Sequence, residues 1–143
     1  MNQALAFELL LFEQENSLRI LVAEDDADLR RLLAVALRRD GHAVIEARDA
    51  AELLEALAST LIEPVASPFD VVICEQTLPG IPGLSLLAGL RSRQRATPFI
   101  LVTDQAAVRD RARRLGAAVV DHLDVQAIRA AVRRAAEIGP AND

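Results

Sequence analysis

The sequence predicts an α/β fold in which helices cover both faces of a parallel sheet. Short apolar segments alternate along the chain with longer segments whose apolar residues recur at helical spacing. The short segments lack the polar alternation of a half-exposed strand, so both faces of the sheet should be buried. The length of 143 residues suits one domain, and 52% hydrophobic with only 3% aromatic residues predicts a core of Leu, Val, Ile and Ala.

Five strand segments alternate with five helical ones. The first strand, LRILVA, is apolar, too short for a helix, and ends in the acidic segment EDDAD. Apolar residues then recur at helical spacing from Leu29 to Leu37, and Gly41 supplies a stop. Asp49 is the expected N-cap of the second helix. On the same grounds, strands are expected at residues 18–23, 42–47, 69–74, 98–103 and 117–121, and helices at 29–39, 49–60, 83–93, 104–116 and 124–137.

Right-handed crossovers between these strands predict a doubly wound, flavodoxin-like (βα)5 domain around a five-stranded sheet. We assign this domain to residues 18–137. Residues 1–17 form an extension, expected to be an extra N-terminal helix, and residues 138–143 read as a tail or the start of a linker. The apolar stretch at residues 4–12 is too short to span a bilayer and contains Glu8, so no membrane segment is expected.

The composition indicates which classes of partner and which cellular location to expect. The net charge of −5 disfavours direct binding to nucleic acid. Cys74 is the only cysteine, so no intrachain disulfide can form; we expect a buried, inert thiol and a cytoplasmic location. Lysine and arginine together number 16, and every one of them is arginine. Any mechanism that requires a lysine is therefore excluded.

Polar side chains follow three of the expected strands. Glu24 and Asp25 come after the first strand, Glu75 after the third and Thr103 at the end of the fourth. The carboxyl ends of parallel strands meet at one edge, which would gather these side chains around one crevice. Clustered carboxylates repel unless a cation or a proton lies between them, and Mg²⁺ prefers oxygen ligands. We expect an acidic pocket that binds Mg²⁺ weakly, although acids at strand ends also serve as helix N-caps.

The order of these motifs resembles the receiver domain of bacterial two-component response regulators over roughly residues 18–137. ILVAEDDADLRRLL is similar to the first strand and acid pair, FDVVICEQTLPGIPGLSLL to the third strand and its loop, PFILVT to the fourth strand, and LGAAVV to the approach to the fifth. In that family the acid pair and an acceptor aspartate hold Mg²⁺. The aspartate takes a phosphoryl group from a histidine kinase, and a Thr or Ser with a Lys reads it. The resemblance implies that Glu24 and Asp25 are the acid pair and Thr103 the switch hydroxyl.

The chain departs from the family pattern at the acceptor. By its spacing to the following PGIPG segment, Glu75 stands at the acceptor position, with a side chain one methylene longer than aspartate. The family lysine falls near His122 or Leu123 and is absent, so His122 would replace its charge only in part. Val120 stands where many receivers carry an aromatic residue on the fifth strand.

Two interpretations of this altered pocket follow. Glu75 imitates a phosphorylated aspartate and locks the domain in one conformation, or the pocket has decayed and the domain survives as a protein-binding module. We favour a phosphorylation-independent module, without enzymatic turnover, whose partner is a histidine kinase or an output protein. The alternatives are a receiver that still accepts phosphoryl groups or binds Mg²⁺ as a phosphorelay switch, and a small Mg²⁺-dependent phosphatase.

Two surfaces offer contacts between copies of the chain. The N-terminal extension, if helical, is apolar around nearly its whole circumference, so it should pack on its own domain or pair with its counterpart in a homodimer, unless it is a disordered leader. In receivers the face of the fourth helix, fifth strand and fifth helix commonly mediates dimerisation. The helices at 104–116 and 124–137 carry seven arginines that would pair there with Asp110, Asp121 and Asp124, unless these arginines lie on solvated helix faces.

Overall fold

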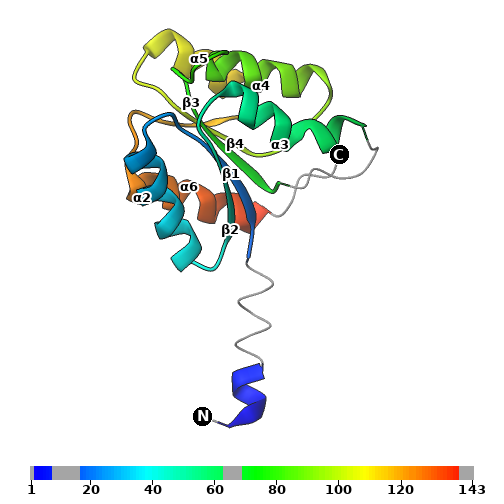
Figure 1. Cartoon of the computed structure of the whole chain (residues 1–143), viewed down its shortest axis with the longest axis vertical. Coiled ribbons are helices and arrows are strands. Elements are labelled where there is room, and N and C mark those ends of the chain that lie inside the picture. Colours follow the sequence, from blue (N-terminus) through cyan, green and yellow to red (C-terminus); the bar gives the residue numbers. More distant parts are fainter. Residues whose placement is uncertain (1, 8–16, 63–68, 139–143) are drawn as a thin grey trace.

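The computed structural model describes residues 2–7, 17–62 and 69–138, and a five-stranded sheet forms its middle layer (Figure 1). The strands are β1 (Arg19–Ala23), β2 (Ala43–Ala47), β3 (Val71–Glu75), β4 (Phe99–Val102) and β5 (Ala118–Val120). All neighbouring pairs are parallel, in the order β2-β1-β3-β4-β5. The chain moves from β1 to one edge and then across to the other, so the sheet is doubly wound. The predicted flavodoxin-like fold is confirmed.

Helices cover both faces of the sheet, with α2 and α6 on one side and α3, α4 and α5 on the other (Figure 1). Their bounds are α2 (Ala27–Arg39), α3 (Ala50–Ile62), α4 (Gly83–Ser92), α5 (Ala106–Arg114) and α6 (Val125–Ile138). The predicted strands and helices agree with these bounds to within about two residues. One difference matters for the site: Glu75 closes β3, whereas we had expected it to follow the strand.

Residues 3–7 form a helical turn, which is the described part of the N-terminal extension. The side chain of Asn2 accepts a hydrogen bond from the N–H of Leu5 at 2.8 Å, as an N-cap does. The rest of the extension, the predicted loop at 63–68 and the end of the predicted tail lie outside the described residues. Within the described ranges, no helix is long and apolar enough to cross a membrane.

The sheet separates two apolar cores. Leu21 and Leu101 belong to the core beneath α3, α4 and α5, whereas their neighbours Ile20 and Ile100 belong to the core beneath α2 and α6. Successive residues of a strand point to opposite faces, so burial on both sides explains the unbroken apolar runs in the sequence. Cys74 lies in the first core, where burial raises the pKa of its thiol to about 12. The thiol therefore stays protonated, as predicted.

Hydrogen bonds fix the helix ends. Asp26 accepts from the N–H groups of Asp28 and Leu29 and caps α2, and Asp49 accepts from the N–H of Glu52 as predicted. These caps satisfy backbone donors that have no partner within the helix.

Two of the three aspartates expected to pair across a dimer face have partners within the chain. Asp121 pairs with Nη1 of Arg109 at 2.7 Å, and Asp124 caps α6 by accepting from the N–H groups of Gln126 and Ala127. Arg129 of α6 pairs with Asp40 at 2.6 Å, which lowers the pKa of that carboxyl. These arginines and aspartates therefore stabilise the fold of one copy.

The start of α4 is tied to the end of β3. The N–H of Gly83 donates to the carbonyl of Gln76 at 3.0 Å, and the N–H of Leu84 donates to the side-chain oxygen of Gln76 at 2.7 Å. Gln76 thus supplies a side-chain cap for this helix. The approach requires glycine at position 83, because a Cβ there would lie 2.7 Å from the carbonyl oxygen of Glu75 and 2.7 Å from Cδ1 of Leu101.

We expect Gly83→Ala to lower the free energy of unfolding by about 2–3 kcal/mol, because the added methyl group meets backbone that cannot move aside. Urea unfolding followed by circular dichroism measures this change. Gly89→Ala in the same helix is the matched control, since a Cβ there meets nothing within 4 Å. The control should gain about 0.5–1 kcal/mol from helix propensity. Similar effects of the two substitutions would contradict a close approach at Gly83.

Candidate functional site

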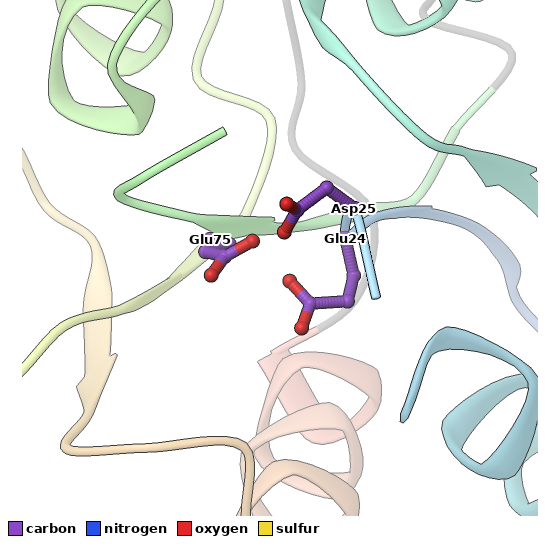
Figure 2. A group of neighbouring side chains, drawn as sticks. All are labelled: Glu24, Asp25 and Glu75. Atoms are coloured by element: carbon purple, nitrogen blue, oxygen red, sulfur yellow. The ribbon is translucent and has the colours of Figure 1, made fainter. Parts of the chain in front are cut away.

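The register of the sheet brings the acidic residues together. Ala23 of β1 pairs with Cys74 of β3, so Glu24 leaves β1 at the level where Glu75 ends β3. Figure 2 shows the carboxyl groups of Glu24 and Asp25 turned toward that of Glu75. One oxygen from each of the three groups lies within 4.8 Å of the others. These three residues are called the acidic trio below.

A pocket of about 240 Å³ opens beside the trio, at the carboxyl ends of the strands. Thr103 lines this pocket and is only 5% exposed. Its hydroxyl oxygen accepts from the N–H of Gln105 at 3.2 Å, which holds the side chain at the start of α5. The structure therefore places the fourth expected residue at the same pocket as the carboxylates.

Glu24 is buried, with 5% of its surface exposed. Its backbone is fixed because its N–H donates to the carbonyl of Ala47 at 3.0 Å and its carbonyl accepts from Nη1 of Arg30 at 2.8 Å. Burial, followed by the hydrogen bond to Glu75 and the charge of that carboxylate, raises the pKa of Glu24 to about 8. Without a cation beside it, Glu24 is therefore protonated at neutral pH.

Glu75 is the anion of the trio. Burial acts to raise its pKa, but hydrogen bonds from Glu24, Asp25 and Thr77 outweigh burial and lower it. The Thr77 hydroxyl donates to Oε1 of Glu75 at 2.8 Å. Asp25 is exposed, and its pKa is raised chiefly by its hydrogen bond to Glu75. The proton on Glu24 and its hydrogen bond to Glu75 relieve part of the repulsion within the trio.

Two oxygen atoms of the trio have no hydrogen-bond partner among the described residues. They are Oε2 of Glu24 and Oε2 of Glu75, and both are buried. A buried oxygen acceptor in a native protein normally meets a donor or a cation. Three neighbouring carboxyl groups, two of them with an unpaired buried oxygen, match the hard oxygen ligands that Mg²⁺ takes. The residues present therefore fit a divalent cation.

The segment after β5 carries no ammonium group. His122 is exposed and Leu123 half-buried, and both line the pocket. The Arg109 guanidinium reaches this segment, but its Nη1 pairs with Asp121. The described residues around the pocket thus leave the trio without a cationic side chain of its own.

Sequence reasoning missed the roles of Gln76 and Thr77. Both lie in the loop after β3 and turn back, Thr77 onto the carboxylate of Glu75 and Gln76 onto the first turn of α4. The only signal was the PGIPG segment, which predicts a tight turn and hence a loop that stays close to its own strand.

Comparison with known proteins identifies the family. A family model described as the response regulator receiver domain matches residues 20–135. The chain belongs to this receiver family. The transcriptional regulatory protein TcrA of Mycobacterium tuberculosis is 33% identical over 108 residues, which cover 76% of this receiver and 40% of TcrA. The transcriptional activator protein PfeR of Pseudomonas aeruginosa is 39% identical over 93 residues, which cover 65% of this receiver and 28% of PfeR. The chain thus spans less than half of these relatives.

Solved receiver structures have the same fold. The non-phosphorylated HemR receiver domain from Leptospira biflexa has a TM-score of 0.70 and 28% identity, and the match covers 87% of this receiver and 98% of that chain. The response regulator TrrA of Thermotoga maritima, solved with Mg²⁺ and BeF, has a TM-score of 0.67 and 25% identity over 82% of this receiver and 97% of that chain. The predicted receiver module of two-component signalling is confirmed.

The raised pKa of Glu24 makes stability depend on pH. The native state binds this proton more tightly than the unfolded chain, where the carboxyl has its usual pKa of 4.5. The stabilisation is complete below that value and is lost as the pH rises through about 8. In chelator-treated buffer, we expect the free energy of unfolding to decrease by about 2 kcal/mol between about pH 5 and pH 8.5. Urea titrations across this range measure the slope.

Glu24→Gln is the control, because the amide keeps the shape of the side chain and does not titrate. Its unfolding free energy should vary less with pH than that of the unchanged receiver, and the difference between the two slopes isolates Glu24. Parallel curves for the two proteins would mean that Glu24 is already ionised in the native state at low pH.

Proposed function

We propose that this receiver signals by protein–protein contact and does not depend on phosphoryl transfer. The observation that supports the proposal most directly is the position of Glu75. It ends β3, where the family's acceptor aspartate is expected, and its carboxylate lies within the acidic trio. A negative group thus occupies the pocket before any phosphoryl group arrives.

The length of Glu75 argues against transfer. The extra methylene carries the carboxylate about 1 Å farther into the pocket, and misplacement by that distance can cost a reaction about 100-fold. Thr77 holds Oε1 at 2.8 Å, so the side chain is fixed in this position. An attacking oxygen held there is poorly placed for in-line displacement.

The charges of the pocket support the same conclusion. A transferred phosphoryl group needs positive charge near its oxygens, and the chain has no lysine to supply it. Arg109 is engaged with Asp121, and His122 is exposed. A carboxylate also has less charge and fewer acceptor oxygens than a phosphate, so Glu75 imitates phosphorylation only in part. We therefore favour a phosphorylation-independent module over a permanently locked switch.

Glu24, Asp25 and Glu75 are the residues that would hold Mg²⁺ in this receiver. The ion would compensate their charge and replace the proton that Glu24 otherwise carries. Their two unpaired buried oxygens are the atoms with the most to gain from it.

The family also suggests which proteins this receiver contacts and where the module begins and ends. Receiver modules act with histidine kinases and output domains, and TcrA and PfeR are named as transcriptional regulators. We propose a histidine kinase or an output protein as the partner, with residues 18–137 as the module. The segments at 1–17 and 138–143 would be an extension and the start of a linker.

A phosphorelay switch that still accepts a phosphoryl group on Glu75 is the second candidate. It is supported by the retained acidic trio and by Thr103, whose buried hydroxyl lines the pocket as the family's switch residue would. Phosphoryl transfer to Glu75 would require its carboxylate to move away from the Thr77 hydroxyl and from the other two residues of the trio.

Incubation with acetyl phosphate and Mg²⁺, followed by intact mass spectrometry, separates the two candidates. We expect no phosphoryl adduct on the unchanged receiver, because Glu75 is overlong and no ammonium stabilises the product. Glu75→Asp shortens the side chain and should raise the adduct at least about tenfold. Glu75→Gln is the negative control. An adduct on the unchanged receiver that disappears with Glu75→Gln would overturn phosphorylation independence.

Mg²⁺ affinity should rise with pH, because the ion must displace the proton of Glu24. We expect calorimetric titrations to give an affinity that increases toward about pH 8 and then levels off. Glu24→Gln removes one charged ligand and should weaken binding at least about tenfold while flattening its pH dependence. Unchanged affinity in this variant would place the ion away from the trio.

A further inference from the structure

An apolar groove lies between α3 and α4, on the face of the sheet opposite α2 and α6. Its volume is about 190 Å³. Leu54 and Leu57 of α3 form one wall, and Leu86 and Leu90 of α4 form the other. Leu54 remains 39% exposed. Leu57, Leu86 and Leu90 are buried, so the groove is a shallow apolar seam between two helices with Leu54 exposed at its edge.

The floor of the groove leaves room for a backbone. Gly89 lines it, and a Cβ built on Gly89 meets nothing within 4 Å. Small residues at such positions allow a second helix to approach closely. Arg93, the C-cap of α4, lines the same groove and forms no ion pair within the described ranges. The groove thus combines apolar walls, an open floor and a free cation at one end.

The N-terminal extension has the complementary chemistry. In the helical turn at residues 3–7, Leu5 is 47% and Phe7 61% exposed. The sequence continues with Leu9, Leu10, Leu11 and Phe12, and its charged side chains before β1 are all glutamates, at positions 8, 13 and 15. An apolar segment with acidic residues suits an apolar groove that ends in an arginine.

We propose that the N-terminal segment of one copy of this receiver docks in the α3/α4 groove of a second copy, reciprocally, to form a dimer. Leu5 and Phe7 are exposed in the single chain, and the groove of a second copy offers an apolar surface that would bury them. Reciprocal docking of the two N-terminal segments is two-fold symmetric, so the dimer is closed and neither groove remains free. With Leu5 and Phe7 as the docked side chains, residues 8–18 remain as the connection, and a chain of that length can span up to about 35 Å, about the width of a domain of this size.

The groove also touches the loop of the candidate site. Ile81 lines the groove and lies in the loop that runs from Glu75 to α4. That loop is anchored to α3, because the carbonyl of Pro79 accepts from the N–H of Ala50 at 2.9 Å. A docked segment would therefore pack on the loop that carries Gln76 and Thr77. This inference goes beyond the proposed function and does not rely on the state of Glu75.

Sedimentation equilibrium on the full chain tests the inference with three single variants. Phe7→Gln makes the segment polar, and Gly89→Glu fills the groove and repels the glutamates of the segment. Each should weaken dimerisation at least about tenfold. Leu32→Gln is the matched control, since Leu32 is an apolar residue of α2 that is 57% exposed and lies far from the groove in sequence and on the other face of the sheet. The control should dimerise like the unchanged receiver.

Mixing the two impaired variants gives the sharper result. A mixed dimer of Phe7→Gln and Gly89→Glu has one intact segment facing one intact groove, whereas either variant alone has no intact pair. We expect the mixture to dimerise more strongly than either variant. Circular dichroism confirms that Gly89→Glu remains folded, and Gly89→Gln repeats the block without the charge.

Three outcomes would overturn the inference. A monomeric unchanged receiver at about 100 μM would mean that the segment stays on its own domain or is free, since productive docking of this size reaches micromolar affinity. Dimerisation lost with Phe7→Gln but kept with Gly89→Glu would mean that two N-terminal segments pair with each other. No gain on mixing would exclude reciprocal exchange. None of these results depends on acetyl phosphate, so they leave the proposed function to its own test.

Discussion

Three carboxyl groups meet where β1 and β3 end, and their mutual repulsion governs the chemistry of this receiver. The register of the sheet forces the meeting, because Ala23 and Cys74 are paired and the chain continues into acids directly after them. The repulsion is relieved by a proton on Glu24, by the Thr77 hydroxyl on Glu75, or by a divalent cation. Each of these states presents a different charge to the pocket, while the sheet beneath them stays the same.

The substitution that we propose, of glutamate for the acceptor aspartate, is consistent with the rest of the pocket. A partly buried anion without an ammonium partner needs hydrogen-bond donors, and Glu75 finds them on Glu24, Asp25 and Thr77. Glu75 therefore behaves as an internal member of the trio. This arrangement accounts for a receiver that keeps its fold, its acids and its Thr103 hydroxyl while lacking the lysine of its family.

Much of the fold could be predicted because strands buried on both faces leave an unmistakable pattern. The runs containing Leu21 and Leu101 have no polar interruptions, and the acids at the ends of the first and third strands identified the site. The contributions of Thr77 and Gln76 could not be predicted, since each depends on a loop that turns back on itself in three dimensions. The pairing of Asp121 with Arg109 could not be predicted from the sequence either. The order of charged residues along a helix does not indicate whether the partner of a charge lies in the same copy or in another.

Gln76 couples the end of β3 to the start of α4, which the composition of the chain does not reveal. Its main chain and its side chain hold the first two residues of α4, and the absence of a side chain on Gly83 lets that helix touch the end of β3 directly. A shift of the end of β3 must therefore move the start of α4 with it. A displacement at the pocket would therefore reach α3 and α4 through these hydrogen bonds, without a rotamer change of an aromatic side chain on β5.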